Sequence, residues 1–314
     1  MHLAQLCAAS RVLVVAGKGG VGKTTVTAAL AVAAARSGTS VLIVEVEGKS
    51  GLAATLGIPQ LAYAETDVRP GIRARTLTPE QALLEYLEER GLRRISKRLV
   101  RSGALDVVAT AVPGMKDILV LGKVKQLERA GVADLVIIDA PAAGHAITFL
   151  TSARGLLDAV RVGPVRTQAQ DVMELLTDPT RCRVMLVTLP EETPVNELVD
   201  TAFALEDRVG VSLAPVVVNA FPGDLELAGR WVAADAATSG VALPPVDASA
   251  LDEAAAFGDE RHALARAQAE RLAQLLPLPQ IKLPFVFGEI GPDEVERLAD
   301  ALTDEVAAFP EPGA

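Results

Sequence analysis

The chain is 314 residues long and carries a formal net charge of −10 at pH 7, with a sequence pI near 5.0. This length suits one large α/β domain, and the acidic balance argues against a general affinity for nucleic acid or anionic lipid. Half of the residues are hydrophobic but only 3% are aromatic, so we expect a core of Ala, Val and Leu. The apolar runs are only a few residues long, whereas a membrane-spanning helix needs about 20, so no stable membrane insertion is expected.

Two further features bear on the compartment. Cys7 and Cys182 lie far apart in the sequence, and they provide neither a disulfide framework nor a CxxC metal half-site. The first ten residues lack a basic segment followed by an apolar stretch, so no signal peptide is predicted. We therefore expect a cytoplasmic globular protein.

Residues 11–46 predict a β-strand, a helix and a second β-strand in succession. The segments 11–16 (RVLVVA) and 41–46 (VLIVEV) are apolar and rich in β-branched residues, and the Ala-rich segment 23–36 between them favours a helix. The two strands should be parallel, with a right-handed crossover.

The rest of the chain continues this alternation. Residues 73–76 predict a short strand, and residues from about 79 to 130 predict helices, which we interpret as a helical subdomain inserted between strands. The remaining predicted elements are strands at 134–139, 183–188, 214–219 and 283–287 and helices at 251–276 and 293–308. Short apolar strands that alternate with helices are typical of a mostly parallel, doubly wound sheet covered on both faces. We expect one such α/β domain over residues 1–314.

The loop between the first predicted strand and helix, residues 17–25 (GKGGVGKTT), matches the phosphate-binding pattern G-x-x-x-x-G-K-[ST]. Glycines let backbone N–H groups approach phosphate oxygens, and the helix N-terminus adds partial positive charge. In this pattern Lys23 reaches the β- and γ-phosphates, and the Thr24 hydroxyl binds Mg²⁺. The other expected nucleotide contacts are Gly17, Gly19, Gly20, Val21, Gly22 and Thr25. A chance match is the alternative, but the flanking strand and helix favour a P-loop NTPase that binds ATP or ADP with Mg²⁺.

Lys18, directly after the first glycine, makes the loop similar to the deviant Walker A motif. That motif belongs to a family of dimeric ATPases that includes the arsenite-pump ATPase (ArsA), the tail-anchored-protein targeting ATPase and the partition ATPases. The resemblance implies that Lys18 reaches across a dimer interface to the partner's nucleotide, as an arginine finger supplied in trans does. A solvated loop lysine is the alternative.

A second segment resembles the ArsA branch of that family. Residues 139–145 (DAPAAGH) are similar to its Asp-Thr-Ala-Pro-Thr-Gly-His switch II. The resemblance implies that Asp139 holds Mg²⁺ through water and that the Gly144 N–H senses the γ-phosphate. Asp139 could instead cap a helix, and His145 either couples the switch to the helix behind it or simply packs.

Further segments extend the resemblance over most of the chain. Residues 189–194 (LPEETP) resemble a loop whose backbone and carboxylate, here Pro190 and Glu191, face the partner's nucleotide. Asn219 matches the asparagine that reads the adenine edge, with a turn or capping asparagine as the alternative. Residues 113–117 (PGMKD) look like the Pro-Gly-x-x-Glu segment of the family's helical subdomain. The chain looks most similar to the actinobacterial paired ArsA-like ATPases, in which the stretch VEVEGK also occurs.

The chain departs from the family in switch I. Glu47 stands where the family has its water-positioning aspartate, and the Pro-Ala-His sequence is absent. Glu45 is a second carboxylate near this position, and we rank it behind Glu47. The resemblance implies catalysis by Lys18, Lys23 and Glu47, with hydrolysis slow or partner-dependent because one extra methylene changes the geometry. The alternative is a weakly active, nucleotide-binding regulatory subunit that pairs with a catalytic paralogue.

Several features of particular branches are missing from the sequence. There is no CxxC zinc clasp or Met-rich client groove, there are no clustered thiols for arsenite, and residues 293–314 are acidic where a membrane-binding branch needs a basic helix. The basic segment 90–101 is interpreted as a solvated face or a docking surface, and no nucleic-acid partner is expected.

We predict an Mg-dependent ArsA-like ATPase, a homodimer or a heterodimer with an ArsA-like paralogue. Its nucleotide-driven closure would move the helical subdomain and control a partner, or a transport or stress process.

Overall fold

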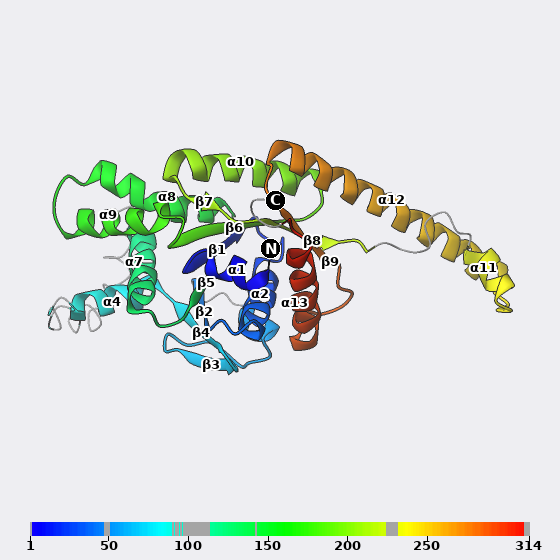
Figure 1. Cartoon of the computed structure of the whole chain (residues 1–314), viewed down its shortest axis with the longest axis horizontal. Coiled ribbons are helices and arrows are strands. Elements are labelled where there is room, and N and C mark those ends of the chain that lie inside the picture. The colour runs from blue at the N-terminus through cyan, green and yellow to red at the C-terminus, as the bar shows by residue number, and fades with distance from the viewer. Residues whose placement is uncertain are drawn as a thin grey trace.

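A central sheet between two layers of helices forms the body of the protein, and one long helix projects from it (Figure 1). The structure, a computed structural model, describes residues 2–46, 51–89, 91, 94, 96, 114–141, 143–223 and 232–310. No helix within these ranges is both long enough and apolar enough to cross a membrane.

The sheet has nine strands in the described part of the chain and is mostly parallel, as the sequence predicts. Its order is β3-β4-β2-β5-β1-β6-β8-β9, and β7 pairs with β6. Only the β3–β4 pair is antiparallel among the described pairs. The strands are β1 (Val12–Gly17), β2 (Val41–Val46), β3 (Thr66–Arg69), β4 (Ile72–Leu77), β5 (Leu135–Asp139), β6 (Cys182–Thr188), β7 (Ser212–Leu213), β8 (Val216–Phe221) and β9 (Gln280–Pro284).

Helices cover both faces of the sheet because its central strands are apolar on both sides. In β1, Val12 and Val14 enter one core, whereas Leu13 and Val15 enter the other. The first core is covered by α7 (Met115–Ala130), α8 (Ala143–Ala159), α9 (Pro164–Thr177), α10 (Glu192–Val209) and the end of α12 (Pro245–Leu275). The second is covered by α1 (Leu3–Ala8), α2 (Lys23–Arg36), α3 (Leu52–Thr55) and α13 (Pro292–Ala307). This arrangement is the predicted doubly wound one.

Two helices are described in the stretch where an inserted helical subdomain is predicted. α4 (Pro79–Glu89) packs on α7 through Ala82, Leu83 and Leu119, and both helices lie between β4 and β5 in the chain. α8 and α9 also pack against α7. Residues 97–113 fall outside the described part of the chain, and the subdomain boundaries stay a prediction.

The last strand does not lie where the sequence predicts it. Apolar side chains at 283–287 suggest a strand there, but β9 is Gln280–Pro284. The reason is its pairing with β8, which begins at Val216 opposite Gln280. Beyond β9, Phe285 and Phe287 are exposed rather than buried.

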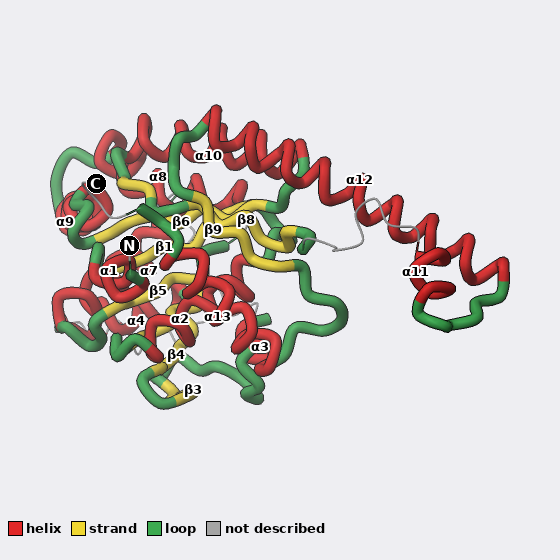
Figure 2. Tube along the Cα trace, turned by 45° about the vertical axis from the view of Figure 1, so that its right-hand side comes forward, coloured by secondary structure: helices red, strands yellow, loops and turns green. Residues whose placement is uncertain are grey.

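The helix predicted at 251–276 begins earlier than expected. α12 starts at Pro245, because proline at the first helical position lacks only an N–H that would have no helical partner there. Its outer part extends away from the body, and α11 (Val232–Thr238) packs beside it, as two views show (Figures 1 and 2). We call this outer part of α12, together with α11, the arm.

Candidate nucleotide-binding site

The carboxyl ends of three central strands bring the predicted phosphate loop and the predicted magnesium ligand together. Val15 of β1 lies opposite Asp139 of β5, and Glu45 of β2 lies opposite the same aspartate. The loop leaves β1 at Gly17 and enters α2 at Lys23. Ligands of parallel α/β sheets bind at this edge.

The path of the loop requires glycine at two points. Gly22 has a φ of 88°, in the left-handed region, and a Cβ on it would lie 2.2 Å from Nδ2 of Asn219. A Cβ on Gly17 would lie 2.3 Å from the carbonyl oxygen of Val187. The Asn219 amide donates a hydrogen bond to the Val21 carbonyl at 2.9 Å. Asn219, predicted to read adenine, therefore also holds the loop in place.

The Lys23 ammonium lies against the backbone of the loop. Its Nζ donates a hydrogen bond to the Lys18 carbonyl oxygen at 2.9 Å. Burial lowers the pKa of Lys23, and the Asp139 carboxylate partly opposes this by raising it. The Lys23 ammonium therefore lies close to both the loop backbone and the Asp139 carboxylate.

Thr24 and Asp139 form a pair suited to magnesium. The Thr24 hydroxyl donates to Oδ2 of Asp139 at 2.8 Å. Burial raises the pKa of Asp139, while the Thr24 hydrogen bond and the Lys23 charge lower it. Its buried Oδ1 finds no hydrogen-bond partner among the described residues. Hydroxyl and carboxylate oxygens are ligands that Mg²⁺ takes, together with water and phosphate, so these residues fit the ion.

The described residues contain no group of three or more His, Cys, Asp or Glu side chains that could hold a metal ion. Such a cluster is not needed for magnesium in phosphate-transfer sites, where one or two protein ligands act together with substrate phosphates. The pair of Thr24 and Asp139 is therefore the candidate place for the ion among the described residues.

Glu45 lies closer to this site than its sequence ranking suggests. It is 3% exposed, and Thr76 donates its hydroxyl proton to Oε2 of Glu45 at 2.8 Å. Burial raises the pKa of Glu45, Thr76 lowers it, and the nearby Asp139 charge raises it. Glu47 lies outside the described residues, so the preference for Glu47 over Glu45 stays a prediction. The strand register, which places Glu45 beside Asp139, was the missed signal.

Lys18 is bound within its own chain. Its Nζ lies 2.6 Å from Oε1 of Glu197 on α10, and both side chains are roughly 40% exposed. The other carboxylate oxygen of Glu197 is buried and has no hydrogen-bond partner in the described part of the chain. Sequence reasoning missed Glu197, because the contact joins residues 179 positions apart.

The remaining predicted residues lie on neighbouring segments. Pro190 and Glu191 precede α10, and they line a pocket of about 260 Å³ whose other wall includes Arg261 and Leu264 of α12. Gly144 and His145 lie in the first turn of α8, which follows β5. Their proposed contacts with nucleotide stay predictions.

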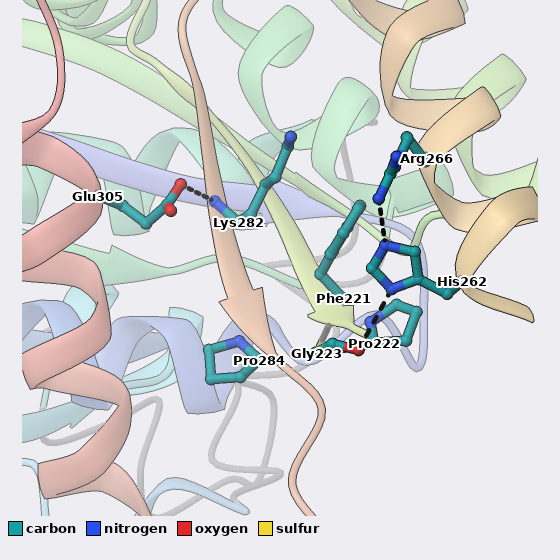
Figure 3. Close-up of a pocket in the computed structure, with 8 residues that line it drawn as sticks. All are labelled: Phe221, Pro222, Gly223, His262, Arg266, Lys282, Pro284 and Glu305. Atoms are coloured by element: carbon teal, nitrogen blue, oxygen red, sulfur yellow. Dashed lines mark hydrogen bonds between the residues drawn. The ribbon is translucent and has the colours of Figure 1, made fainter. Parts of the chain in front are cut away.

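A second hollow, of about 310 Å³, lies at the outer edge of the sheet and was not predicted (Figure 3). Phe221 ends β8 there, and the Lys282 ammonium lies 5.1 Å from the centre of its ring. His262 and Arg266 approach from α12, whereas the Glu305 carboxylate of α13 accepts a hydrogen bond from the Lys282 backbone N–H. The hollow is separate from the phosphate loop, and the predicted site residues do not line it.

Comparison with known proteins agrees with the resemblance. The profile of the family described as ArsA_ATPase, anion-transporting ATPase, matches residues 10–162. A Mycobacterium tuberculosis protein named ATPase BagA is 32% identical over 320 residues, covering 94% of this chain and 93% of its own length. An Acidiphilium multivorum protein named arsenical pump-driving ATPase is 31% identical over 205 residues, covering 65% of this chain and 33% of its own length. This chain belongs to the ArsA-like ATPase family and has the α/β P-loop fold expected of it.

Proposed function

We propose that this chain binds ATP with Mg²⁺ at residues 17–25 and hydrolyses it to ADP and phosphate. The observation that supports this most strongly is the Thr24–Asp139 hydrogen bond, which lies beside the Lys23 ammonium. Phosphoryl-transfer sites bring the same three groups together: a hydroxyl, a carboxylate and an ammonium. In such sites, positioning and charge stabilisation provide most of the catalysis.

Each side chain has a separate role in the proposed reaction. Thr24 would hold Mg²⁺ directly and Asp139 would hold it through water, and the ion would supply positive charge to offset charge that develops on the phosphates. The loop N–H groups and Lys23 bind the phosphate oxygens. Glu47 orients the attacking water, and the Gly144 N–H detects the γ-phosphate. Asn219 binds the adenine edge.

The second part of the proposal is a dimer whose closure depends on nucleotide. Lys18 acts on the partner's nucleotide, and Pro190 and Glu191 face that nucleotide as well. Lys18 must first leave Glu197, a cost that stays small because the pair is partly exposed to water. ATP drives closure to the extent that it binds the closed state more tightly than the open one. Closure moves the helical region and so controls a partner, with the whole cycle taking place in the cytoplasm.

Two observations favour a second candidate, a weakly active regulatory subunit that pairs with a catalytic paralogue. Glu47 replaces the family's aspartate, and Lys18 is held within its own chain. This candidate predicts that ATP binds but is not hydrolysed until a paralogue is added.

The test is steady-state ATP hydrolysis by the purified chain, with and without Mg²⁺. We expect Mg-dependent turnover in the wild type, at least a hundredfold loss in Lys23→Ala, and no loss in the control Lys282→Ala, which removes an ammonium from the outer sheet edge. Equal turnover in Lys23→Ala and wild type would overturn the proposal. Turnover by the wild-type chain alone separates the two candidates, and Glu47→Gln then removes that turnover only if Glu47 positions the water.

A further inference from the structure

Helix α12 presents an apolar stripe that is exposed in the single chain. Val246, Phe257, Leu264 and Leu275 are 79%, 62%, 64% and 43% exposed, respectively. In an α-helix of 3.6 residues per turn, spacings of eleven, seven and eleven residues keep these side chains within about 20° of one line. The body-facing residues Ala265, Ala269 and Leu272 are buried, and they begin about 70° away from that line. The stripe is therefore not the face that α12 uses to attach to its own body.

The stripe is symmetric about its midpoint. Phe257 lies as far before the point between Glu260 and Arg261 as Leu264 lies after it. Val246 and Leu275 are placed in the same way about the same point. An antiparallel copy of the helix would set Phe257 against the copy's Leu264, and Val246 against the copy's Leu275. A two-fold interface requires this reciprocal pairing.

The charges on α12 are divided at the same midpoint. The outer half, from Pro245 to Glu260, has five acidic residues and no basic ones. The inner half has Arg261, Arg266 and Arg271 and a single acid, Glu270. In the antiparallel arrangement each acidic half lies along a basic half, and Glu260 meets the copy's Arg261. A parallel arrangement would place like charges together, which is unfavourable.

We propose that the stripe is a dimer contact, on which α12 of a second copy of this chain packs antiparallel. The contact is continuous with the surface assigned above to the partner's nucleotide, because Leu264 lines the same pocket as Pro190 and Glu191. The inference deepens the dimer part of the proposed function, but it rests on α12 alone. It selects the homodimer over a heterodimer with a paralogue.

Disulfide trapping tests the geometry directly. Cys7 and Cys182 are buried, so cysteines added to the stripe are the exposed thiols among the described residues. The double variant Phe257→Cys/Leu264→Cys should oxidise to a covalent dimer in at least about half of the molecules. Phe257→Cys alone should remain monomeric on a denaturing gel, because its two copies lie about 10 Å apart along the seam. Trapping by the single variant, or no trapping by the double variant, would overturn the proposal.

Sedimentation measures self-association independently of disulfide trapping, and we apply it to variants with reversed charges or altered apolar residues. Glu260→Arg and Arg261→Glu should each raise the dimer dissociation constant about tenfold, and the double reversal should restore it. Phe257→Glu/Leu264→Glu should be monomeric. Its matched control Ala256→Glu/Ala263→Glu adds the same charges on exposed positions about 100° away from the stripe and should stay dimeric.

The result of disulfide trapping does not depend on ATP hydrolysis. We expect trapping to persist when Lys23→Ala is added, since the stripe holds no nucleotide. An ATPase-inactive chain that still forms the disulfide would contradict the proposed activity and leave the arm contact standing. An active chain that sediments as a monomer at all concentrations, or whose two apolar variants dimerise equally, would contradict the arm contact and leave the activity standing.

Discussion

The phosphate loop and the arm use the same chain in opposite ways. The loop is fixed from within: Asn219 binds the Val21 carbonyl, Lys23 binds the Lys18 carbonyl, and Thr24 binds Asp139. The outer part of α12 contacts little of its own chain apart from α11, and its largest apolar side chains are exposed to water. The role of the phosphate loop can therefore be tested within one molecule. The role that we propose for the exposed surface depends on contact with a second molecule.

The largest effect is expected at Asp139. Asp139→Asn keeps an acceptor for Thr24 but removes the charge that we propose holds magnesium, and we expect at least a hundredfold loss of ATP turnover. The stability of the fold, by contrast, should increase in this variant. The pKa of Asp139 is raised in the fold, so ionisation destabilises the protein increasingly as pH rises above the ordinary value of 3.8. The Asn variant should therefore melt higher at pH 7.

Asp134→Asn is the matched control at the other end of β5. Hydrogen bonds from Ser40 hold the pKa of Asp134 below its usual value. That carboxylate stabilises the fold above pH 3.8, and the stabilisation is lost as pH falls through the lowered pKa. Asp134→Asn should lower the melting temperature at pH 7 and leave turnover unchanged. A fall in both quantities for both variants would contradict the assignment of Asp139.

A second prediction compares two leucines of α12. Leu272 is fully buried against the body, and Leu272→Ala should reduce the free energy of unfolding by about 2–5 kcal/mol. Leu264 lies on the exposed stripe, and Leu264→Ala should change it by less than about 0.5 kcal/mol. Urea denaturation at a concentration where the chain is monomeric measures both. A large loss in Leu264→Ala under those conditions would mean that the stripe packs on its own chain.

The third prediction uses two glycines with nearly the same φ angle. Gly22 and Gly38 have φ values of 88° and 89°, but a Cβ would meet Asn219 only at Gly22. Gly38→Ala should cost about 1 kcal/mol of strain. Gly22→Ala should cost about 2 kcal/mol, because it also breaks the Asn219–Val21 hydrogen bond, and it should weaken ATP binding. Equal denaturation midpoints and unchanged ATP binding would show that Asn219 does not support the loop.

The smallest effect is expected at Glu45. Because burial raises its pKa, its ionisation destabilises the fold as pH rises from about 4.5 through the raised value, and the cost is constant above that. Glu45→Gln should therefore be more stable than wild type at pH 7. The difference should disappear below pH 4.5 in thermal melts across pH. A difference that does not depend on pH would contradict this account.

Much of the fold could be predicted because the local signals agree with the tertiary ones. β1, β2, β5 and β6 are apolar runs whose ends lie within about one residue of the prediction, and α2 coincides with it. β3 was missed because its residues are polar and partly exposed, and only pairing with β4 makes it a strand. β9 was misplaced because register with β8 overrides local hydrophobicity.

The candidate site also contains some residues that the sequence predicts and others that depend on tertiary contacts. Lys23, Thr24 and Asp139 could be named from sequence, since a motif specifies their types and spacing. Glu197 and the position of Glu45 beside Asp139 depend on contacts between distant segments, which no local pattern encodes. The stripe on α12 was visible in the sequence as spacing, but its exposure could be known only from the structure.

The most direct test of the central claim is calorimetric titration of ATP into the purified chain, with and without Mg²⁺, for wild type and Lys23→Ala. Binding at the phosphate loop is common to the self-sufficient enzyme and to the regulatory subunit, so the test does not depend on which is correct. We predict one ATP bound per chain, tighter with Mg²⁺, and loss of that binding in Lys23→Ala. Undiminished ATP binding by a folded Lys23→Ala variant, or no binding by the wild type, would contradict the account.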